Sequence, residues 1–489
     1  MARSNKRSRF NKNKTRRRHI QRKKYIKNGG AEEGERDSAM SWLKPPVGDP
    51  AFRTQLDTLV STMPEQGPLG SYLRAVCSSS GYCMSLGQKR QLINHFFDGF
   101  ANMKYAFPPL KKIASGNNGF VLGVDYQRNT YKAICTLKCS LKKTSDNLFY
   151  EAYVGKTYIN RLCEFFPLFL ETFACYWIDN IDVYNELQEA MPFSSIASTQ
   201  SLGELLNRNA LQIIDPTDMS NLDKAACNDP KRVCVLTEFI ENAYALGDVV
   251  KAYISKAAAE GPFLNHALPV ILFQVYSVLA AIGPEYTHYD LHPGNCLIYT
   301  IPNNKYLTLI YHQKNGTTVE LNTIFIAKLI DYGRCFVPTS SAFHSAVSAT
   351  PACLTRGEAV AGSNNGFEWF EPSAQPAYYW ISSKIFNWSH DLRLVSQLSS
   401  MVGNGFHIGR MMRRVTYNTK FGTPSVNPSF PNPDRKIRNT VEMANELTNF
   451  FNVDPGYKNA NAKLFTSRTK IGDLHIYLDR SQPMNLILS

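Results

Sequence analysis

The chain has 489 residues, of which 44% are apolar, a composition that excludes a fully disordered protein and allows two or more lobes or domains. The formal net charge of +14 comes almost entirely from residues 1–30, which hold 13 Lys or Arg and no acidic residue. The rest of the chain carries 41 basic and 40 acidic residues and is nearly neutral. The positive charge therefore belongs to a tail.

The N-terminal segment has two predicted parts. Residues 1–40 are predicted to form a disordered basic tail and linker, because a run of like charge without an apolar period does not pack. The basic residues 1–30 attract nucleic acid or another polyanion, and the same composition also serves as a nuclear import signal, so both interpretations stay open. Residues 41–104 are predicted to form a helical N-terminal extension.

The cysteines and the most apolar segment bear on the location of the protein. Eleven cysteines are scattered without a C-x-x-C pair, which favours free thiols in a reducing, intracellular compartment. The apolar run at 268–283 is interrupted by Gln274, Tyr276 and Ser277 and is short for a membrane span. It is predicted to be a buried helix, and no membrane partner is expected.

From residue 107 the segment "FPPLKKIASGNNGFVLGVDYQRNTYKAICTLKCSL" consists of β-prone runs broken by Gly and Asn, which predicts a strand meander. Within it, "IASGNNGFV" matches a glycine-rich phosphate loop in which Ala114 replaces the first glycine. Gly116 and Gly119 would let the backbone approach a phosphate closely, and Val121 follows them. The alternative is that this Gly/Asn cluster is only a hairpin turn.

The next segment offers a strand lysine and a helix carboxylate. Lys138 lies on a predicted strand, 17 residues after Val121. The following helix has one apolar face at three-four spacing, formed by Leu148, Gly155, Tyr158 and Leu162. Glu151 lies on this face, and a buried carboxylate needs a cation, so Lys138 is its expected partner. The alternative is that Glu151 reaches solvent.

The remaining pattern favours an α+β fold in two lobes. Residues 168–177 and 233–240 are predicted strands, and the polar stretch near 178–232 is a predicted insertion. Helices are expected to dominate the rest of the chain, apart from a hairpin-like stretch at 304–330 and a Ser/Ala/Gly/Asn-rich loop at 338–366. Strands first and helices later are typical of α+β proteins.

Two polar segments that adjoin apolar strands indicate a catalytic site. The loop in "YTHYDLHPGNCLIYT" carries Asp290 and Asn295, and "AKLIDYGRCF" ends its strand at Asp331. H-x-D-L-x-x-x-N followed by a strand and D-x-G is the arrangement of protein kinases. Asp290 fits the carboxylate beside the acceptor hydroxyl, while Asn295 and Asp331 offer the hard oxygen ligands that magnesium prefers. The alternative for the first loop is a plain Pro-Gly turn.

The chain resembles the protein-kinase-like superfamily over roughly residues 105–400. It looks most like the divergent serine/threonine kinases of large nucleocytoplasmic DNA viruses, through "FFPLFLETFACY", "THYDLHPGNCLIY", "AKLIDYGR" and "SHDLRLV". The resemblance implies a bilobal fold, with a β-rich N-lobe at 105–240 and a helical C-lobe at 241–489. It also implies ATP and magnesium as cofactors, and a location in the host cytoplasm, nucleus or virion.

The resemblance also assigns roles to single residues. Lys138 would bind the phosphates of ATP, and Glu238 and Ile240 would offer backbone groups to adenine, with Leu297 as the floor of that pocket. Asp391 matches the buried aspartate that braces the catalytic loop from below.

Three departures from the protein-kinase pattern leave the class of acceptor molecule undecided. Tyr289 replaces the Arg that clamps a phosphorylated activation loop, His292 replaces a phosphate-binding Lys, and no A-P-E follows Asp331. The leading prediction is an ATP- and Mg-dependent serine/threonine protein kinase. The alternatives are a small-molecule kinase of the same fold and a non-catalytic, kinase-like virion or nucleic-acid-anchored protein.

Overall fold

The structure is a computed structural model that describes residues 76–77, 83–84, 97–100, 106–115, 119–128, 131–140, 148–179, 211–228, 233–240, 243–301, 304–350, 368–370, 380–417 and 436–488. The predicted basic tail and most of the predicted N-terminal extension lie outside these residues. The described part of the extension contains two short paired strands and a 3-10 turn, namely β1 (Val76–Cys77), β2 (Cys83–Met84) and η2 (Asp98–Phe100).

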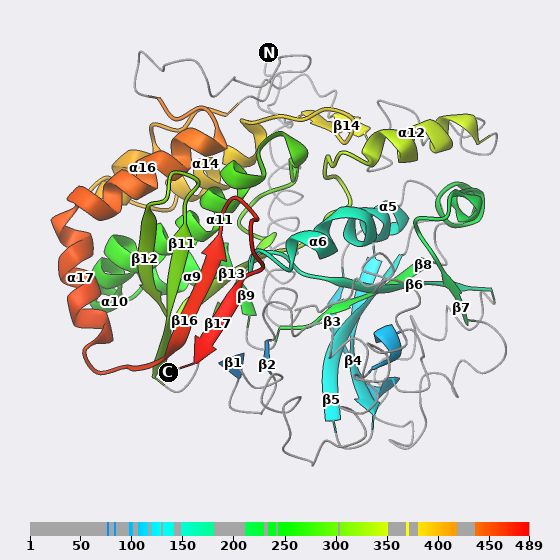
Figure 1. Cartoon of the computed structure of the whole chain (residues 1–489), viewed down its shortest axis with the longest axis horizontal. Helices are drawn as coiled ribbons and strands as arrows, with labels where there is room; N and C mark the ends of the chain where they lie inside the picture. The colour runs from blue at the N-terminus through cyan, green and yellow to red at the C-terminus, as the bar shows by residue number, and fades with distance from the viewer. Residues whose placement is uncertain are drawn as a thin grey trace, which may run out of the picture.

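A six-stranded sheet forms the first large unit, on the right in Figure 1. Its strands run antiparallel in the order β3-β4-β5-β8-β6-β7. Their bounds are β3 (Ala106–Ser115), β4 (Gly119–Arg128), β5 (Tyr131–Ser140), β6 (Thr172–Ile178), β7 (Leu211–Ile214) and β8 (Val233–Glu238). The predicted strand meander and the two later predicted strands are present, and the predicted insertion contributes β7 as an edge strand.

One helical segment lies against this sheet, above it in Figure 1. It consists of α5 (Leu148–Val154), the π-helical turn η4 (Gly155–Ile159) and α6 (Asn160–Leu162). A Cβ on Gly155 would overlap the side chain of Thr172 in β6, so the close approach of helix and sheet requires glycine there. Almost the whole segment is buried, with Arg161 as its exposed residue, so the apolar face expected from the sequence does not distinguish one side of it.

The second large unit, on the left in Figure 1, combines helices with two sheets. The three-stranded sheet has the order β13-β10-β9, with β9 (Ala243–Ala245), β10 (Cys296–Thr300) and β13 (Phe325–Leu329). The four-stranded sheet has the order β12-β11-β16-β17, with β11 (Lys305–His312), β12 (Thr318–Thr323), β16 (Thr469–Tyr477) and β17 (Asn485–Leu488). The protein is therefore a mixed α+β structure in its described part.

The other elements of this unit are helical. They are α9 (Leu246–Ile254), α10 (Ala257–Pro262), η9 (Phe263–Ala267), α11 (Leu268–Ile282), η10 (Gly283–Glu285), η11 (His390–Leu392), α14 (Arg393–Ser399), α15 (His407–Met412), α16 (Thr440–Val453) and α17 (Pro455–Phe465). The run Ala259–Glu285 is long and apolar enough to cross a membrane by length and composition. However, 83% of the apolar 18-residue window within it is buried inside the protein. Its central part, α11, is the buried helix predicted from the sequence.

Two features beyond residue 241 differ from the prediction. The helical second part also contains the sheet in which β16 pairs parallel to β11. The signal was a short alternation in "TKIGDLHIY", where Leu474 and Ile476 are buried between more exposed neighbours. The predicted loop at 338–366 begins with a helix, α12 (Ser340–Ala349), because Phe343 and Val347 bury one face of it, while 351–366 lie outside the described residues.

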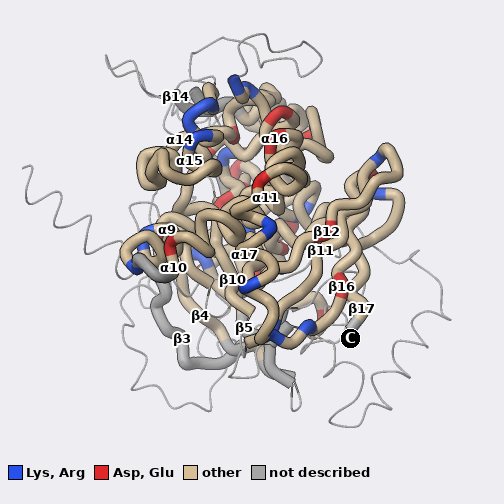
Figure 2. Tube along the Cα trace, turned by 90° about the vertical axis from the view of Figure 1, so that its left-hand side faces the viewer, with Lys and Arg blue, Asp and Glu red and all other residues tan. Residues whose placement is uncertain are grey.

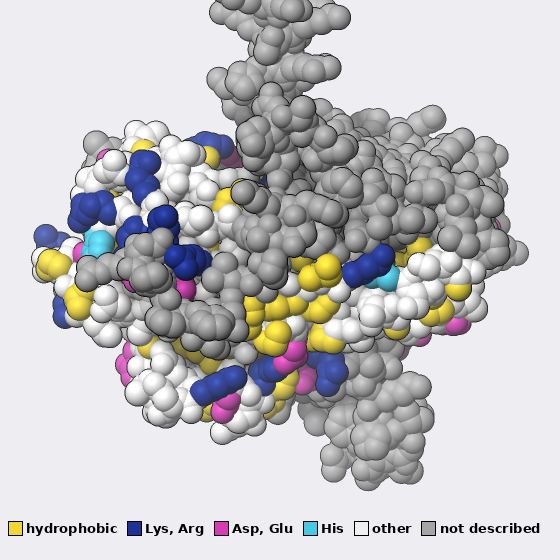
Figure 3. Space-filling model, turned by 90° about the horizontal axis from the view of Figure 1, so that it is seen from above, with side chains coloured by type: hydrophobic (Ala, Val, Ile, Leu, Met, Phe, Trp, Pro, Cys, Tyr) yellow, Lys and Arg dark blue, Asp and Glu magenta, His cyan; other side chains and the backbone are white. Residues whose placement is uncertain are grey.

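Two short strands complete the described elements, β14 (Glu368–Phe370) and β15 (Trp380–Ser382), together with the turns η6 (Met219–Asn221) and η7 (Asp223–Asn228). Basic and acidic residues are interspersed along the trace, in keeping with the nearly neutral composition beyond the tail (Figure 2). Figure 3 views the molecule from above, and Lys and Arg side chains gather on the left half of this face, the side on which α14 and α16 lie in Figure 1.

Candidate active site

The first part of the site is an ion pair between the sheet and the helix that covers it. Lys138 in β5 lies opposite Val121 in β4, and its Nζ donates to Oε1 of Glu151 in α5 at 2.6 Å. Glu151 is only 5% exposed, so the carboxylate needs this cation. The ion pair expected from the helical pattern is present.

A second carboxylate lies close to this pair. Burial raises the pKa of Glu151, the charge of Lys138 lowers it, and the nearby charge of Asp331 raises it. Asp331 follows β13 with a φ of 70°, a left-handed conformation that is uncommon outside glycine but is tolerated by Asp. Strained residues of this kind concentrate at functional sites. The backbone of the next residue, Tyr332, hydrogen bonds to Glu151, so the structure brings Asp331 close to the Lys138–Glu151 pair.

The loop between η10 and β10 is held by one buried carboxylate. The backbone N–H groups of His288 and Tyr289 donate to the two carboxylate oxygens of Asp391, at 2.8 and 3.0 Å. Tyr289 has a φ of 61°, so these bonds stabilise a left-handed turn at a bulky residue. Burial raises the pKa of Asp391 to about 7, against the two hydrogen bonds and the charge of Arg393. The geometry is that of a brace beneath the loop.

The same loop is tied to the strand that precedes Asp331. His288 is fully buried, and its Nε2 donates to the carbonyl oxygen of Ile330 at 3.0 Å. Burial lowers the pKa of His288, so the imidazole is neutral and this nitrogen carries the proton. The N–H of Ile330 in turn donates to the carbonyl of Asn295 at 3.2 Å. Two hydrogen bonds therefore fix Asp331 relative to the loop.

Asp290 is held by two arginines that the sequence did not single out. Nη1 of Arg393, at the start of α14, donates to Oδ1 of Asp290 at 2.7 Å, and Nη1 of Arg334 lies 3.5 Å from Oδ2. Burial alone would raise the pKa of Asp290, but the charges of Arg334, His292 and Arg393 together lower it. The carboxylate is therefore ionised at neutral pH. Each arginine closely follows a motif aspartate in "DYGR" and "SHDLR", which was the available signal.

Asn295 and Asp331 were predicted to bind magnesium. The side-chain nitrogen of Asn295 donates to the carbonyl of Asp290 at 3.0 Å, which leaves its oxygen as an acceptor. In the described residues, no group of three or more His, Cys, Asp or Glu side chains is arranged to hold a metal ion by itself. An amide oxygen and one carboxylate suit magnesium, which usually keeps waters and substrate phosphates as its other ligands. The donor types are compatible with this ion, and magnesium binding by Asn295 and Asp331 stays a prediction.

The predicted glycine-rich loop is described only in part. Gly116 lies outside the described residues, and Ala114 in β3 pairs with Val121 in β4. A Cβ on Gly119 would overlap the carbonyl oxygen of Cys139 in β5, so the sheet itself requires glycine at this position. The role of Ala114, Gly116, Gly119 and Val121 in phosphate binding stays a prediction.

Of the predicted adenine-binding residues, Glu238 ends β8, Ile240 follows it, and Leu297 lies in β10. The N–H of Glu238 donates to the carbonyl of Glu171 at 3.2 Å, and the carbonyl of Glu238 accepts from the Thr136 hydroxyl at 3.3 Å. The side chains of Ile240 and Leu297 are buried in the core. Because the N–H of Glu238 is already used within the sheet, only its carbonyl has capacity left for a ligand. Binding of adenine by these residues stays a prediction.

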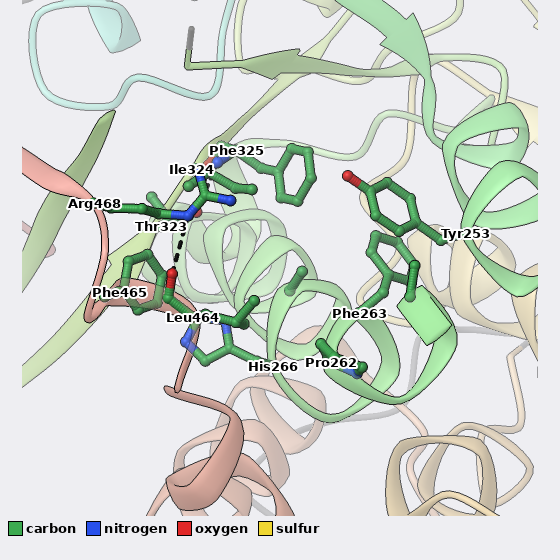
Figure 4. Close-up of a pocket in the computed structure, with 12 residues that line it drawn as sticks. Tyr253, Pro262, Phe263, His266, Thr323, Ile324, Phe325, Leu464, Phe465 and Arg468 are labelled. Atoms are coloured by element: carbon green, nitrogen blue, oxygen red, sulfur yellow. Dashed lines mark hydrogen bonds between the residues drawn. The ribbon is translucent and has the colours of Figure 1, made fainter. Parts of the chain in front are cut away.

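A cavity of about 210 Å³ lies elsewhere, between α10, η9, β13 and the end of α17 (Figure 4). None of the predicted site residues lines it.

No protein-family model matches the chain, and no curated protein matches it. A crystal structure of a kinase domain is similar to part of the chain, with 14% sequence identity and a TM-score of 0.24. The similarity covers 49% of this chain and 54% of that chain, so the protein matches about half the length of that structure. A similarity at this level carries no argument about function, which has to come from the site.

Proposed function

We propose that the chain is an ATP- and Mg²⁺-dependent phosphotransferase with a bilobal protein-kinase-like fold, related to the divergent serine/threonine kinases of large nucleocytoplasmic DNA viruses. One observation carries this proposal. The Lys138–Glu151 ion pair lies beside Asp331, and Asp331 is tied to the loop that holds Asp290 and Asn295. A cation, a carboxylate base and two oxygen ligands in one neighbourhood are what phosphoryl transfer requires.

Each residue then has a defined task. Lys138, oriented by Glu151, binds phosphate oxygens and offsets their charge. Asp331 and the side-chain oxygen of Asn295 would hold magnesium, which supplies charge stabilisation at the transferred phosphoryl group. The neutral His288 and the buried Asp391 are assigned no contact with the substrate. Their hydrogen bonds hold the loop of Asp290 and Asn295 in place against the segment that carries Asp331.

Asp290 is the proton acceptor in this proposal. Its carboxylate is ionised at neutral pH, and the Arg393 guanidinium fixes one of its oxygens. The other oxygen, which lies 3.5 Å from Nη1 of Arg334, has a further lone pair that can accept the proton of a substrate hydroxyl. Protein kinases usually place a Lys two residues after this carboxylate, where this chain has His292. We assign the missing cation to Arg393, which reaches Asp290 from α14.

The acceptor is proposed to be a Ser or Thr hydroxyl on a protein. Residues 335–340, which follow Asp331 closely, are anchored on α5, because the Tyr150 hydroxyl hydrogen bonds to the Cys335 carbonyl at 2.7 Å and to the Ser340 hydroxyl at 2.6 Å. The alternative is a small hydroxylated metabolite, which His292 and the missing A-P-E favour. A non-catalytic, kinase-like virion protein is the third candidate, and the presence of Lys138 with its partner argues against it.

The deciding experiment offers both acceptor classes side by side. The full chain is incubated with γ-labelled ATP and Mg²⁺, once with a protein mixture and once with a metabolite pool. Label on protein Ser or Thr supports the leading proposal, and label on a small molecule supports the alternative. Absence of transfer in both, with the chain folded, would leave only the non-catalytic candidate.

The basic tail is proposed to bind nucleic acid or another polyanion in the host cytoplasm or nucleus, or within the virion. This rests on its 13 basic residues alone. Contacts of this kind neutralise phosphates with little sequence preference.

A further inference from the structure

The cavity in Figure 4 has the composition of a small-molecule site. Three aromatic rings form one wall. Tyr253 at the end of α9 stacks on Phe263 with 4.4 Å between ring centroids, and both rings make T-shaped contacts with Phe325, at centroid distances of 6.0 and 6.3 Å. Leu464 and Phe465 of α17 form the opposite wall. Flat apolar molecules fit between such walls, because stacking and edge contacts add to the gain from burial.

One charged side chain, Arg468, lies among these apolar lining residues. Arg468 is half-buried, and its Nε donates to the Leu464 carbonyl at 3.0 Å. Within the part of the chain that the structure describes, its two terminal nitrogens have no ion-pair or hydrogen-bond partner. His266 also lines the cavity, but burial lowers its pKa to about 4, so it is neutral at physiological pH. Arg468 is therefore the only charged group among the lining residues.

A second polar group lies opposite this arginine. Figure 4 shows the Tyr253 hydroxyl and the Arg468 guanidinium pointing toward one another across the cavity. Burial raises the pKa of Tyr253, and the charge of Arg468 lowers it, as expected if the two groups are near each other. Among the described residues the Tyr253 hydroxyl has no hydrogen-bond partner, so both groups are available to one acidic ligand.

We propose that this cavity binds a small organic acid with a flat apolar body, whose carboxylate contacts Arg468 and Tyr253. The volume of about 210 Å³ suits a ligand of one or two fused rings. An apolar chamber with a few convergent polar groups is the usual form of a ligand site. The site is independent of the proposed transfer reaction, because none of the residues assigned to that reaction lines it.

Binding of 2-naphthoate, followed by its fluorescence, tests the proposal, with the uncharged 2-naphthamide as the matched probe. The full chain is expected to bind the acid at least tenfold more tightly than the amide, as a charged hydrogen bond contributes about that factor. Arg468→Gln should reduce binding of the acid to the level of the amide and leave the amide unchanged. Arg410→Gln, in α15 and exposed, is the control and should bind both probes as the unmodified chain does.

A second variant tests the location. Ala259→Leu adds volume at a half-exposed helical position that lines the cavity, so it should weaken both probes at least tenfold. Equal affinities for acid and amide, an unchanged affinity in Arg468→Gln, or no binding of 2-naphthoate up to millimolar concentration would each overturn the proposal. Since binding is measured directly, a chain without ATP turnover can still pass this test.

Discussion

Replacing Arg393 by Gln should impair catalysis without unfolding the chain. The Arg393 guanidinium lies 2.7 Å from Asp290, and the two side chains are 8% and 12% exposed. Removing one partner of a buried pair costs about 3–5 kcal/mol of folding stability, and Arg334 at 3.5 Å should reduce this cost so that the chain stays folded. In the transition state the Asp290 carboxylate would have lost the cation that fixes it. We therefore expect a loss of about 2 kcal/mol in transition-state stabilisation, which corresponds to a roughly 30-fold lower kcat.

The assay compares kcat at saturating Mg-ATP, with the melting temperature as a check on folding and Arg410→Gln as the control. The decisive variant is the double substitution His292→Lys with Arg393→Gln, which moves the cation to the position that protein kinases use. It should recover at least tenfold of the lost kcat, a recovery that a purely structural role of Arg393 would not give. A kcat of Arg393→Gln within threefold of the unmodified chain, or no recovery in the double variant, would refute the reasoning.

Three further predictions follow from the same geometry. Lys138→Met and Glu151→Gln should each lower turnover, and their effects should not add in a double-mutant cycle, because either loss already breaks the pair; simple additivity contradicts this. Asp391→Asn should cost about 1–3 kcal/mol in unfolding free energy, since an amide nitrogen would face one of two backbone N–H groups. Burial raises the pKa of Asp391 in the folded chain to about 7. Its contribution to folding stability, relative to Asn, should therefore be greatest below about pH 4 and decline as the pH rises through 7. Urea unfolding of the unmodified chain and of Asp391→Asn across this range tests the direction of this change. Deleting residues 1–30 should abolish salt-sensitive DNA or RNA binding and spare ATP turnover. An unchanged dependence of binding on salt would assign it to Lys and Arg side chains beyond residue 30, such as those on the left half of the view in Figure 3.

Local patterns were enough to predict much of the fold. The meander that becomes β3, β4 and β5 was visible because β-prone runs alternate with Gly and Asn. The Lys138–Glu151 pair was visible because a carboxylate on an apolar helix face requires a cation. By contrast, β16 was missed, since its short alternation follows a helix and its parallel partner β11 is more than 150 residues away.

Contacts between distant segments explain what was missed in the site. Arg393 and Asp290 are 103 residues apart, and only the packing of α14 beneath the loop brings them together. Asp391 was predicted from resemblance alone, because no local pattern indicates which aspartate will accept bonds from Tyr289 and its neighbour. For Gly119 a local contact suffices. The sequence assigned this glycine to phosphate binding, but its close packing against the Cys139 carbonyl in β5 already explains why a glycine is needed there.

The most direct test of the central claim is phosphoryl transfer by the unmodified chain and by Asp290→Asn. The unmodified chain should transfer the γ-phosphate of ATP to an acceptor hydroxyl only when Mg²⁺ is present. Asp290→Asn keeps the shape but removes the proton acceptor, so transfer should fall at least about 100-fold while ATP still binds. Transfer by Asp290→Asn at the unmodified rate, or no Mg²⁺-dependent transfer by the folded chain to any protein or metabolite acceptor, would contradict the account.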